Sequence, residues 1–247
     1  MKENRVEHEI LHGKRIASGD SELLWGWGTP AGRLRAQRRA GLIAEGARLC
    51  SKSRVLEIGC GTGMFTEMFS RSGCSIIAVD LSAELLEKAA LRNLPKDRVQ
   101  FVKKPFESCL LDGPFDAVIG SSVLHHLEVE ASLLKIYELL KPGGVMSFAE
   151  PNMLNPQIFA ERKFRRFFPR ISQDETAFMR SSLKRLLKKS GFCDISIVPF
   201  DWLHPAVPEK LIPAVSATGR VLERIPFVRE FSGSLHILAM RPAENAT

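Results

Sequence analysis

Residues 55–63 read Val-Leu-Glu-Ile-Gly-Cys-Gly-Thr-Gly, a short apolar run that leads directly into glycines 59, 61 and 63. Three apolar residues and one acid predict a strand here. Helix-forming residues follow at once, from Met64 to Met68. A glycine-rich turn between a strand and a helix lets the backbone approach a ligand closely, with the helix N-terminus pointing at it. The stretch therefore predicts a ligand-binding turn.

A second strand and an acid follow this turn. The chain returns as Ser75-Ile-Ile-Ala-Val79 and ends in Asp80. An acid at the tip of the second strand, roughly twenty residues beyond the glycines, is the usual partner of the two hydroxyls of a ribose. The sequence therefore predicts an adenosine cofactor, with Asp80 at its ribose.

The residues around the glycines indicate which adenosine cofactor binds. The dinucleotide fingerprint is G-x-G-x-x-G, whereas here the spacing is G-x-G-x-G and Met64 stands in the place of the third glycine. Glu57 also lies inside the first strand, two residues before Gly59. A carboxylate there would repel a pyrophosphate and attract a cationic ligand such as S-adenosylmethionine.

With these residues the chain resembles the class I S-adenosylmethionine-dependent methyltransferases. The likeness runs from about Arg54 to Pro151, through VLEIGCGTG, AVDLS, FDAVIGSSVLHHL and LKPGGVMSFAEPN in the expected order. It implies S-adenosylmethionine as the cofactor and an α/β fold with a doubly wound, mostly parallel sheet. It also implies seven strands in the order 3-2-1-4-5-7-6, the last of them antiparallel, with helices on both faces.

The resemblance assigns cofactor contacts residue by residue. The glycines are expected at the methionine half of the cofactor, together with Gly120 and Ser121, and Leu81 is expected against the adenine. An acid usually follows the third strand and bonds the adenine, but Pro105 stands there, so the backbone of Phe106 or the side chain of Glu107 is expected to replace it. The predicted cofactor-binding residues are Glu57, Gly59, Cys60, Gly61, Gly63, Asp80, Leu81, Phe106 and Ser121.

Two histidines and an acid are the candidate catalytic residues. His125 and His126 directly follow the fourth strand, and Glu150 ends the fifth. Because these strands are expected to be neighbours, a histidine and Glu150 can meet, and a carboxylate behind an imidazole suits a general base. Alternatively, Leu-His-His-Leu is an ordinary lead-in to a helix and Glu150 a polar strand end.

Length and composition predict one domain. The 247 residues are 45% hydrophobic, enough for a sizeable core. We expect a helical N-terminal cap at 1–50, the cofactor-binding core at 51–151, and substrate-cover insertions with the last strands at 152–247. A polar N-terminus and the lack of a long apolar run predict a cytoplasmic protein. The five cysteines form no C-x-x-C pair, so neither a metal site nor a disulfide framework is expected.

Hydrophobic periodicity and turn residues locate the individual elements. Helices are expected at 33–50, 64–72, 82–93, 129–140 and 175–190, and the helix at 129–140 is expected to end at Lys141-Pro-Gly-Gly144. Strands are expected at 54–58, 75–79, 98–102, 115–120, 143–149, 192–198 and 234–240.

Two added segments, 155–170 and 201–231, are expected to roof the acceptor pocket, because they follow strands that end at the ligand-binding edge. The apolar wall would consist of Phe159, Phe164, Phe167, Phe168, Trp202 and Leu203, and the charged rim of Arg162, Arg165 and Arg166. The basic, Phe-rich run 158–170 could equally track an RNA backbone, contact an anionic membrane, or form a solvated lid helix.

The expected function is methyl transfer from S-adenosylmethionine to a small-molecule or lipid-linked acceptor, with oxygen as the methylated atom. The net charge of +7 suits nucleic acid, an anionic membrane or solubility alone. The chain lacks an Asn/Asp-Pro-Pro-Tyr/Phe run and a Pro-Cys pair, which argues against a nucleic acid partner. An RNA methyltransferase and a non-catalytic S-adenosylmethionine-binding protein remain the alternatives, and the oligomeric state stays open.

Overall fold

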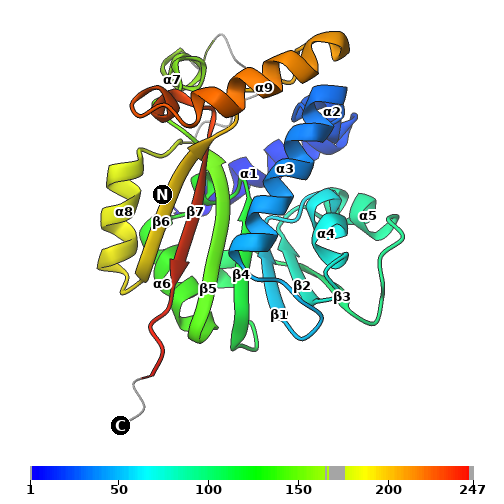
Figure 1. The fold of residues 1–247 in the computed structure, drawn as a ribbon. Coiled ribbons are helices and arrows are strands. Elements are labelled where there is room, and N and C mark those ends of the chain that lie inside the picture. Colours follow the sequence, from blue (N-terminus) through cyan, green and yellow to red (C-terminus); the bar gives the residue numbers. More distant parts are fainter. Residues whose placement is uncertain (1, 165, 167–175, 245–247) are drawn as a thin grey trace.

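A seven-stranded sheet forms the centre of the protein in the computed structural model, which describes residues 2–164, 166 and 176–244 (Figure 1). Within these residues the strand order is β3-β2-β1-β4-β5-β7-β6, as predicted. Neighbouring strands are parallel except that β7 runs antiparallel to both β5 and β6. The strands are β1 (Arg54–Ile58), β2 (Ser75–Asp80), β3 (Val99–Lys103), β4 (Phe115–Ser121), β5 (Leu140–Pro151), β6 (Cys193–Phe200) and β7 (Ser234–Met240).

Helices cover both faces of the sheet and its carboxyl edge (Figure 1). The α-helices are α1 (Lys2–Ala17), α2 (Ser21–Leu24), α3 (Pro30–Gly46), α4 (Met64–Ser70), α5 (Ala83–Ala90), α6 (Val129–Leu139), α7 (Pro156–Lys163), α8 (Arg180–Lys189) and α9 (Ile212–Leu222). Short 3-10 helices are η1 (Phe106–Ser108), η2 (Leu124–His126), η4 (Glu209–Leu211) and η5 (Val228–Phe231).

The core has one half on each side of the sheet. On one side α3, α4 and α5 pack on the strands, with Ile43 and Phe69 fully buried. On the other side α6 and α8 pack on the strands, with Ile136 and Leu187 fully buried. Both faces of the central strands are therefore covered, which explains why β1 and β4 are nearly continuous apolar runs rather than alternating ones.

One predicted boundary that differs lies around Lys141-Pro-Gly-Gly144. Helix α6 ends at Leu139, and β5 begins at Leu140, so these four residues belong to a strand rather than only to the end of a helix. Leu140 pairs with Phe115, and the register shifts before Ala117 pairs with Val145. These turn residues therefore lie within β5, as an irregularity at its start. Helix α8 begins at Arg180 rather than at 175, which lies outside the described residues.

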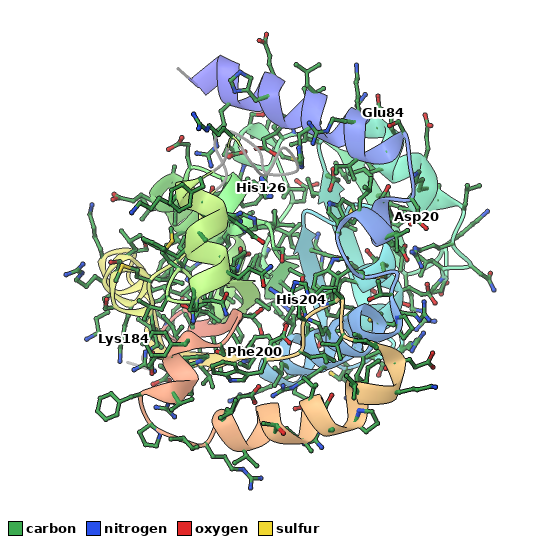
Figure 2. All side chains as sticks on the ribbon, turned by 90° about the horizontal axis from the view of Figure 1, so that it is seen from above. Asp20, Glu84, His126, Lys184, Phe200 and His204 are labelled. Carbon is green, nitrogen blue, oxygen red and sulfur yellow. The ribbon has the colours of Figure 1, made fainter. Side chains whose placement is uncertain are left out.

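The carboxyl edge of the sheet is the part covered by segments added to the minimal fold. Helices α1, α2, α7 and α9 all lie at this edge (Figure 1). Seen from above, α1 and α9 lie on opposite sides of it, and His126 lies beside α1 (Figure 2). No helix within the described ranges is long and apolar enough to cross a membrane.

Candidate functional site

A cavity of about 500 Å³ opens at the carboxyl ends of β1, β2 and β4. This volume lies within the range of small-molecule and cofactor pockets. Its walls come from the turn after β1, the ends of β2 and β4, the segment after β3, and the N-terminal cover. The residues lining the cavity include Arg5, Glu9, His12, Gly13, Ile16, Trp25, Trp27, Gly59, Cys60, Gly61, Asp80, Leu81, Pro105, Phe106, Glu107, Ser121, His125, His126, Glu128 and Pro151.

The turn after β1 requires glycine at two positions. Gly59 has a φ of +69°, and a Cβ there would lie 2.4 Å from Val123 Cγ2. Gly61 has a φ of +52°, and a Cβ there would lie 3.2 Å from the ring of Trp25. Both positions combine a left-handed backbone with close packing, so a side chain is excluded at either. The bare backbone of Gly59 and Gly61 therefore forms part of the cavity wall.

Asp80, at the end of β2, is hydrogen-bonded to the glycine turn. Its Oδ2 accepts a hydrogen bond from Gly61 N at 2.8 Å, and its Oδ1 accepts one from Ser82 N at 2.9 Å. Burial raises the pKa of this carboxyl above its usual value, although the backbone N–H donors oppose the rise. The side chain lines the cavity, at the position predicted for a ribose contact.

Glu57 lies behind the glycine turn rather than in the cavity wall. Its side chain is buried, and its Oε2 has no hydrogen-bond partner. Burial raises the pKa of Glu57 to about 8, and the neighbouring Thr66 opposes this rise only in part. A cation bound in front of the turn would favour the ionised carboxylate, because opposite charges attract strongly across a poorly solvated gap.

His125 and Glu150 meet, as the strand order predicted. His125 Nδ1 lies 2.6 Å from Glu150 Oε2, and both side chains are almost fully buried. The other oxygen, Oε1, accepts hydrogen bonds from the backbone N–H groups of Val123 and Leu124, each at 2.9 Å. Burial opposes ionisation of Glu150, but the nearby His125 and these hydrogen bonds hold its pKa below the usual value. The pair therefore places an anchored carboxylate behind an imidazole at the cavity wall.

The second histidine has a different partner. His126 Nδ1 lies 3.0 Å from Glu9 Oε2 of helix α1. The rings of His125 and His126 are 4.2 Å apart, so the two residues form a packed pair at the end of β4. Nothing in the sequence pattern assigned a role to Glu9.

Most of the remaining predicted cofactor residues also line the cavity. Cys60, Leu81, Phe106 and Ser121 do so, with Pro105 and Glu107 beside Phe106. Burial raises the pKa of the Cys60 thiol well above its usual value, so this residue acts as a small neutral side chain. Gly63 is not in the wall. It precedes α4 with a φ of +72° and packs against Ala89. Gly120 is likewise absent from the wall, since it faces Phe148 and Val123.

The described residues of the predicted roof do not line this cavity, and the roof of an acceptor pocket stays a prediction. None of the residues lining the cavity comes from 155–164, 166 or 201–231. Phe159 and Phe164 are half exposed, whereas Leu203 is buried elsewhere in the fold. Arg165, Phe167 and Phe168 lie outside the described residues. The N-terminal cap covers the cavity instead, because α1 and the Trp25–Trp27 segment fold back over the glycine turn.

A clamp holds this N-terminal segment in place. Arg92, which follows α5, donates to Thr62 O in the turn at 2.6 Å and pairs with Glu67 of α4 at 2.5 Å. It also pairs with Glu22 of α2, which in turn accepts a hydrogen bond from the Thr62 hydroxyl at 3.1 Å. The clamp connects the cap, the turn and α4. Charged residues so far apart in the chain carry no local pattern, so the clamp could not be predicted from the sequence.

Comparison with known proteins identifies the family. A family model described as "Methyltransferase domain" matches residues 33–197, well over half of the chain. The chain belongs to the S-adenosylmethionine-dependent methyltransferases. This methyltransferase is 30% identical over 163 residues to the ubiquinone biosynthesis O-methyltransferase of Nitrosospira multiformis, covering 62% of this chain and 67% of that one. It is 37% identical over 106 residues to a malonyl-[acyl-carrier protein] O-methyltransferase of Magnetococcus marinus, covering 41% and 39%.

Solved structures share the fold at low identity. The N-methyltransferase NodS from Bradyrhizobium japonicum, in complex with S-adenosylhomocysteine, superposes with a TM-score of 0.63 at 17% identity, covering 94% of this methyltransferase and 98% of that chain. A putative methyltransferase in complex with the Haloferax volcanii Trm112 activator gives a TM-score of 0.67 at 16% identity, covering 93% and 97%. S-adenosylmethionine is accordingly the cofactor, and the bare glycine turn and the unpartnered oxygen of buried Glu57 fit a cationic ligand at this edge.

Proposed function

We propose that this methyltransferase methylates an oxygen atom of a small-molecule or lipid-linked acceptor. The contact of 2.6 Å between His125 Nδ1 and Glu150 Oε2 at the cavity wall carries the proposal, because a hydroxyl acceptor must lose a proton. Two relatives named O-methyltransferases support it, although the chain spans only 39% of the length of one of them.

The cofactor, when bound, supplies an electrophilic methyl group. Residues proposed to hold it are the predicted ones that line the cavity: Gly59, Cys60 and Gly61 in the turn, Asp80 at the ribose, and Leu81 and Phe106 at the adenine, with Ser121 beside the methionine portion. Glu57 stands behind the turn, where its carboxylate would stabilise a cation. The protein's task is to align the acceptor oxygen with the methyl group and exclude water.

His125 is the proposed general base. With Nδ1 donating to Glu150, the ring is held as the tautomer whose Nε2 accepts a proton. The depressed pKa of Glu150 keeps this carboxylate ionised at neutral pH, so it stabilises the imidazolium that forms. With the cofactor bound, its methyl group would pass to the acceptor oxygen, and His125 would take up the hydroxyl proton at Nε2.

The direct test combines variants with an acceptor search. A cell extract is incubated with isotopically methyl-labelled S-adenosylmethionine and enzyme, and labelled products are identified by mass spectrometry. Loss of His125 in His125→Ala should lower the rate about a hundredfold or more while binding of S-adenosylhomocysteine is retained. Glu150→Gln should have the same effect more weakly. A product labelled on nitrogen or carbon, or full activity of His125→Ala, would contradict the proposal.

The domain organisation is proposed as predicted. Residues 1–247 form one methyltransferase domain, with the cap at 1–50, the cofactor core at 51–151, and the remaining insertions and strands at 152–247. The cap lines the described cavity, and the later insertions keep their proposed role as the cover of the acceptor.

We also infer a peripheral contact with anionic membrane through α7. Phe159 and Phe164 are each half exposed, beside Arg162 and Lys163 in the last turn. Apolar side chains flanked by cations suit a headgroup region. Sedimentation with vesicles containing anionic lipid should be weakened by Phe164→Ser and should vanish with neutral vesicles. Equal sedimentation with both vesicle types would contradict the inference.

A further inference from the structure

One face of α1 forms a wall of the cavity. The residues on it are Arg5, Glu9, His12, Gly13 and Ile16, spaced as neighbours on one side of a helix. This helix precedes residue 33, where the family match begins. It is therefore an addition to the matched domain that nevertheless reaches the candidate site.

Three contacts dock α1 on this edge. Glu9 Oε2 lies 3.0 Å from His126 Nδ1, and Arg5 Nη1 lies 2.9 Å from Glu128 Oε1. Gly13 packs so closely on Ser82 that a Cβ would lie 3.0 Å from the Ser82 Cβ. The Glu9 side chain is only 10% exposed, against 53% for Glu128. Solvent screens an exposed pair, so the contact between Glu9 and His126 is the stronger electrostatic link.

Two carboxylates thus flank the histidine pair from different parts of the chain. Glu150, in the sheet, contacts His125, and Glu9, on α1, contacts His126. The two rings are 4.2 Å apart with an angle of 38° between their planes, so a shift of one displaces the other. The other titratable or charged groups facing His126 are His12 at a ring distance of 6.4 Å, Asp80 at the end of β2, and the paired Arg5 and Glu128.

We propose that Glu9 is a positioning residue of the active site, which holds His126, and through it His125, only when α1 covers the cavity. The closure of α1 over the cavity and the orientation of His125 then occur together. The benefit is that proton transfer is possible only when water is excluded. The role of His125 as the base rests on the proposed function. The contact between Glu9 and His126 does not depend on that function.

The test compares Glu9→Ala and Glu9→Gln with Glu7→Ala, a change on the exposed side of the same helix. Glu9→Ala should lower kcat for labelled-methyl transfer to the extract acceptor about tenfold, because the histidine pair loses the contact at 3.0 Å that positions it. Glu9→Gln should lose less kcat, since its amide keeps a polar oxygen of similar reach beside His126.

Hydrogen exchange provides the readout that needs no activity. In the S-adenosylhomocysteine-bound protein, amides of α1 should exchange about tenfold faster in Glu9→Ala and in His126→Ala. The double variant should be no faster than either, because both changes remove one contact. Additive effects, or Glu9→Ala behaving like Glu7→Ala in exchange and in kcat, would overturn the inference. If His125→Ala remains fully active while exchange shows the coupling, the proposed function fails and the contact stands.

Discussion

At the scale of single residues, the site depends on carboxylates in unequal environments. Asp80, Glu150 and Glu57 all lie within the carboxyl edge or just behind it; Glu150 and Glu57 are buried, whereas Asp80 is partly exposed to the cavity. Glu150 stays ionised because His125 and two backbone N–H groups bind it. Glu57 has an oxygen without a partner, so burial keeps it protonated near neutral pH.

Replacing Asp80 tests the cofactor contact. Asp80→Ala removes the acceptor proposed for two ribose hydroxyls, which should weaken binding of S-adenosylhomocysteine by about 1–3 kcal/mol. Isothermal titration calorimetry measures the change, and Asp97→Ala, an exposed acid after α5, serves as the matched control. An unchanged affinity in a folded Asp80→Ala protein would remove Asp80 from the site.

Glu57 should make the free energy of unfolding depend on pH. The carboxyl ionises near 4.5 when unfolded and near 8 when folded, so the folded state holds the extra proton between these values. The free energy of unfolding of the parent should therefore fall, relative to Glu57→Gln, by up to about 1.4 kcal/mol per pH unit from pH 4.5 to 8. Urea unfolding at pH 5 and pH 8 measures this. Glu87→Gln, an exposed change in α5, should follow the parent, and parallel curves for Glu57→Gln would contradict the expectation.

At the scale of elements, the cavity depends on joining α2, the glycine turn and α4. The hydrogen bonds of Arg92 reach all three. The turn itself carries a left-handed backbone that its neighbours must support. A loss of the clamp should therefore affect both stability and ligand binding.

Arg92→Ala should lower the free energy of unfolding by about 1–3 kcal/mol and weaken cofactor binding. The reason is that Glu22 and Thr62 lose a shared cationic partner at a partly buried position. Arg71→Ala is the matched control, because Arg71 also pairs with Glu67 but is 70% exposed. Urea unfolding and calorimetric titration should separate the two variants. If both variants lower the free energy of unfolding and the cofactor affinity equally and only slightly, the clamp contributes little to either.

At the scale of the whole molecule, ligand binding should stabilise the fold. The cavity wall draws on the cap and on three strand ends, so a ligand there links parts that unfold together. S-adenosylhomocysteine at about 100 times its Kd should add about 2.7 kcal/mol to the free energy of unfolding. For a chain of this size, that corresponds to a Tm increase of about 5–10 °C. Thermal unfolding with NAD at the same concentration is the control, and an equal increase would contradict the cofactor assignment.

The core of the protein was predictable from its sequence, because local rules act there. Apolar runs specify parallel strands buried on both faces, glycines specify a turn with positive φ, and Asp80 follows its strand directly. The meeting of His125 with Glu150 also followed, since neighbouring parallel strands bring their ends together.

What covers the described cavity could not be predicted from the sequence. The cap reaches the cavity through contacts between residues far apart in the chain, such as Glu9 with His126 and Arg92 with Glu22. Such pairs depend on how helices dock on the finished sheet, and no periodicity or spacing encodes them. Helix α1 lines this cavity for that reason, while the insertions at 155–170 and 201–231 stay the predicted roof of the acceptor pocket.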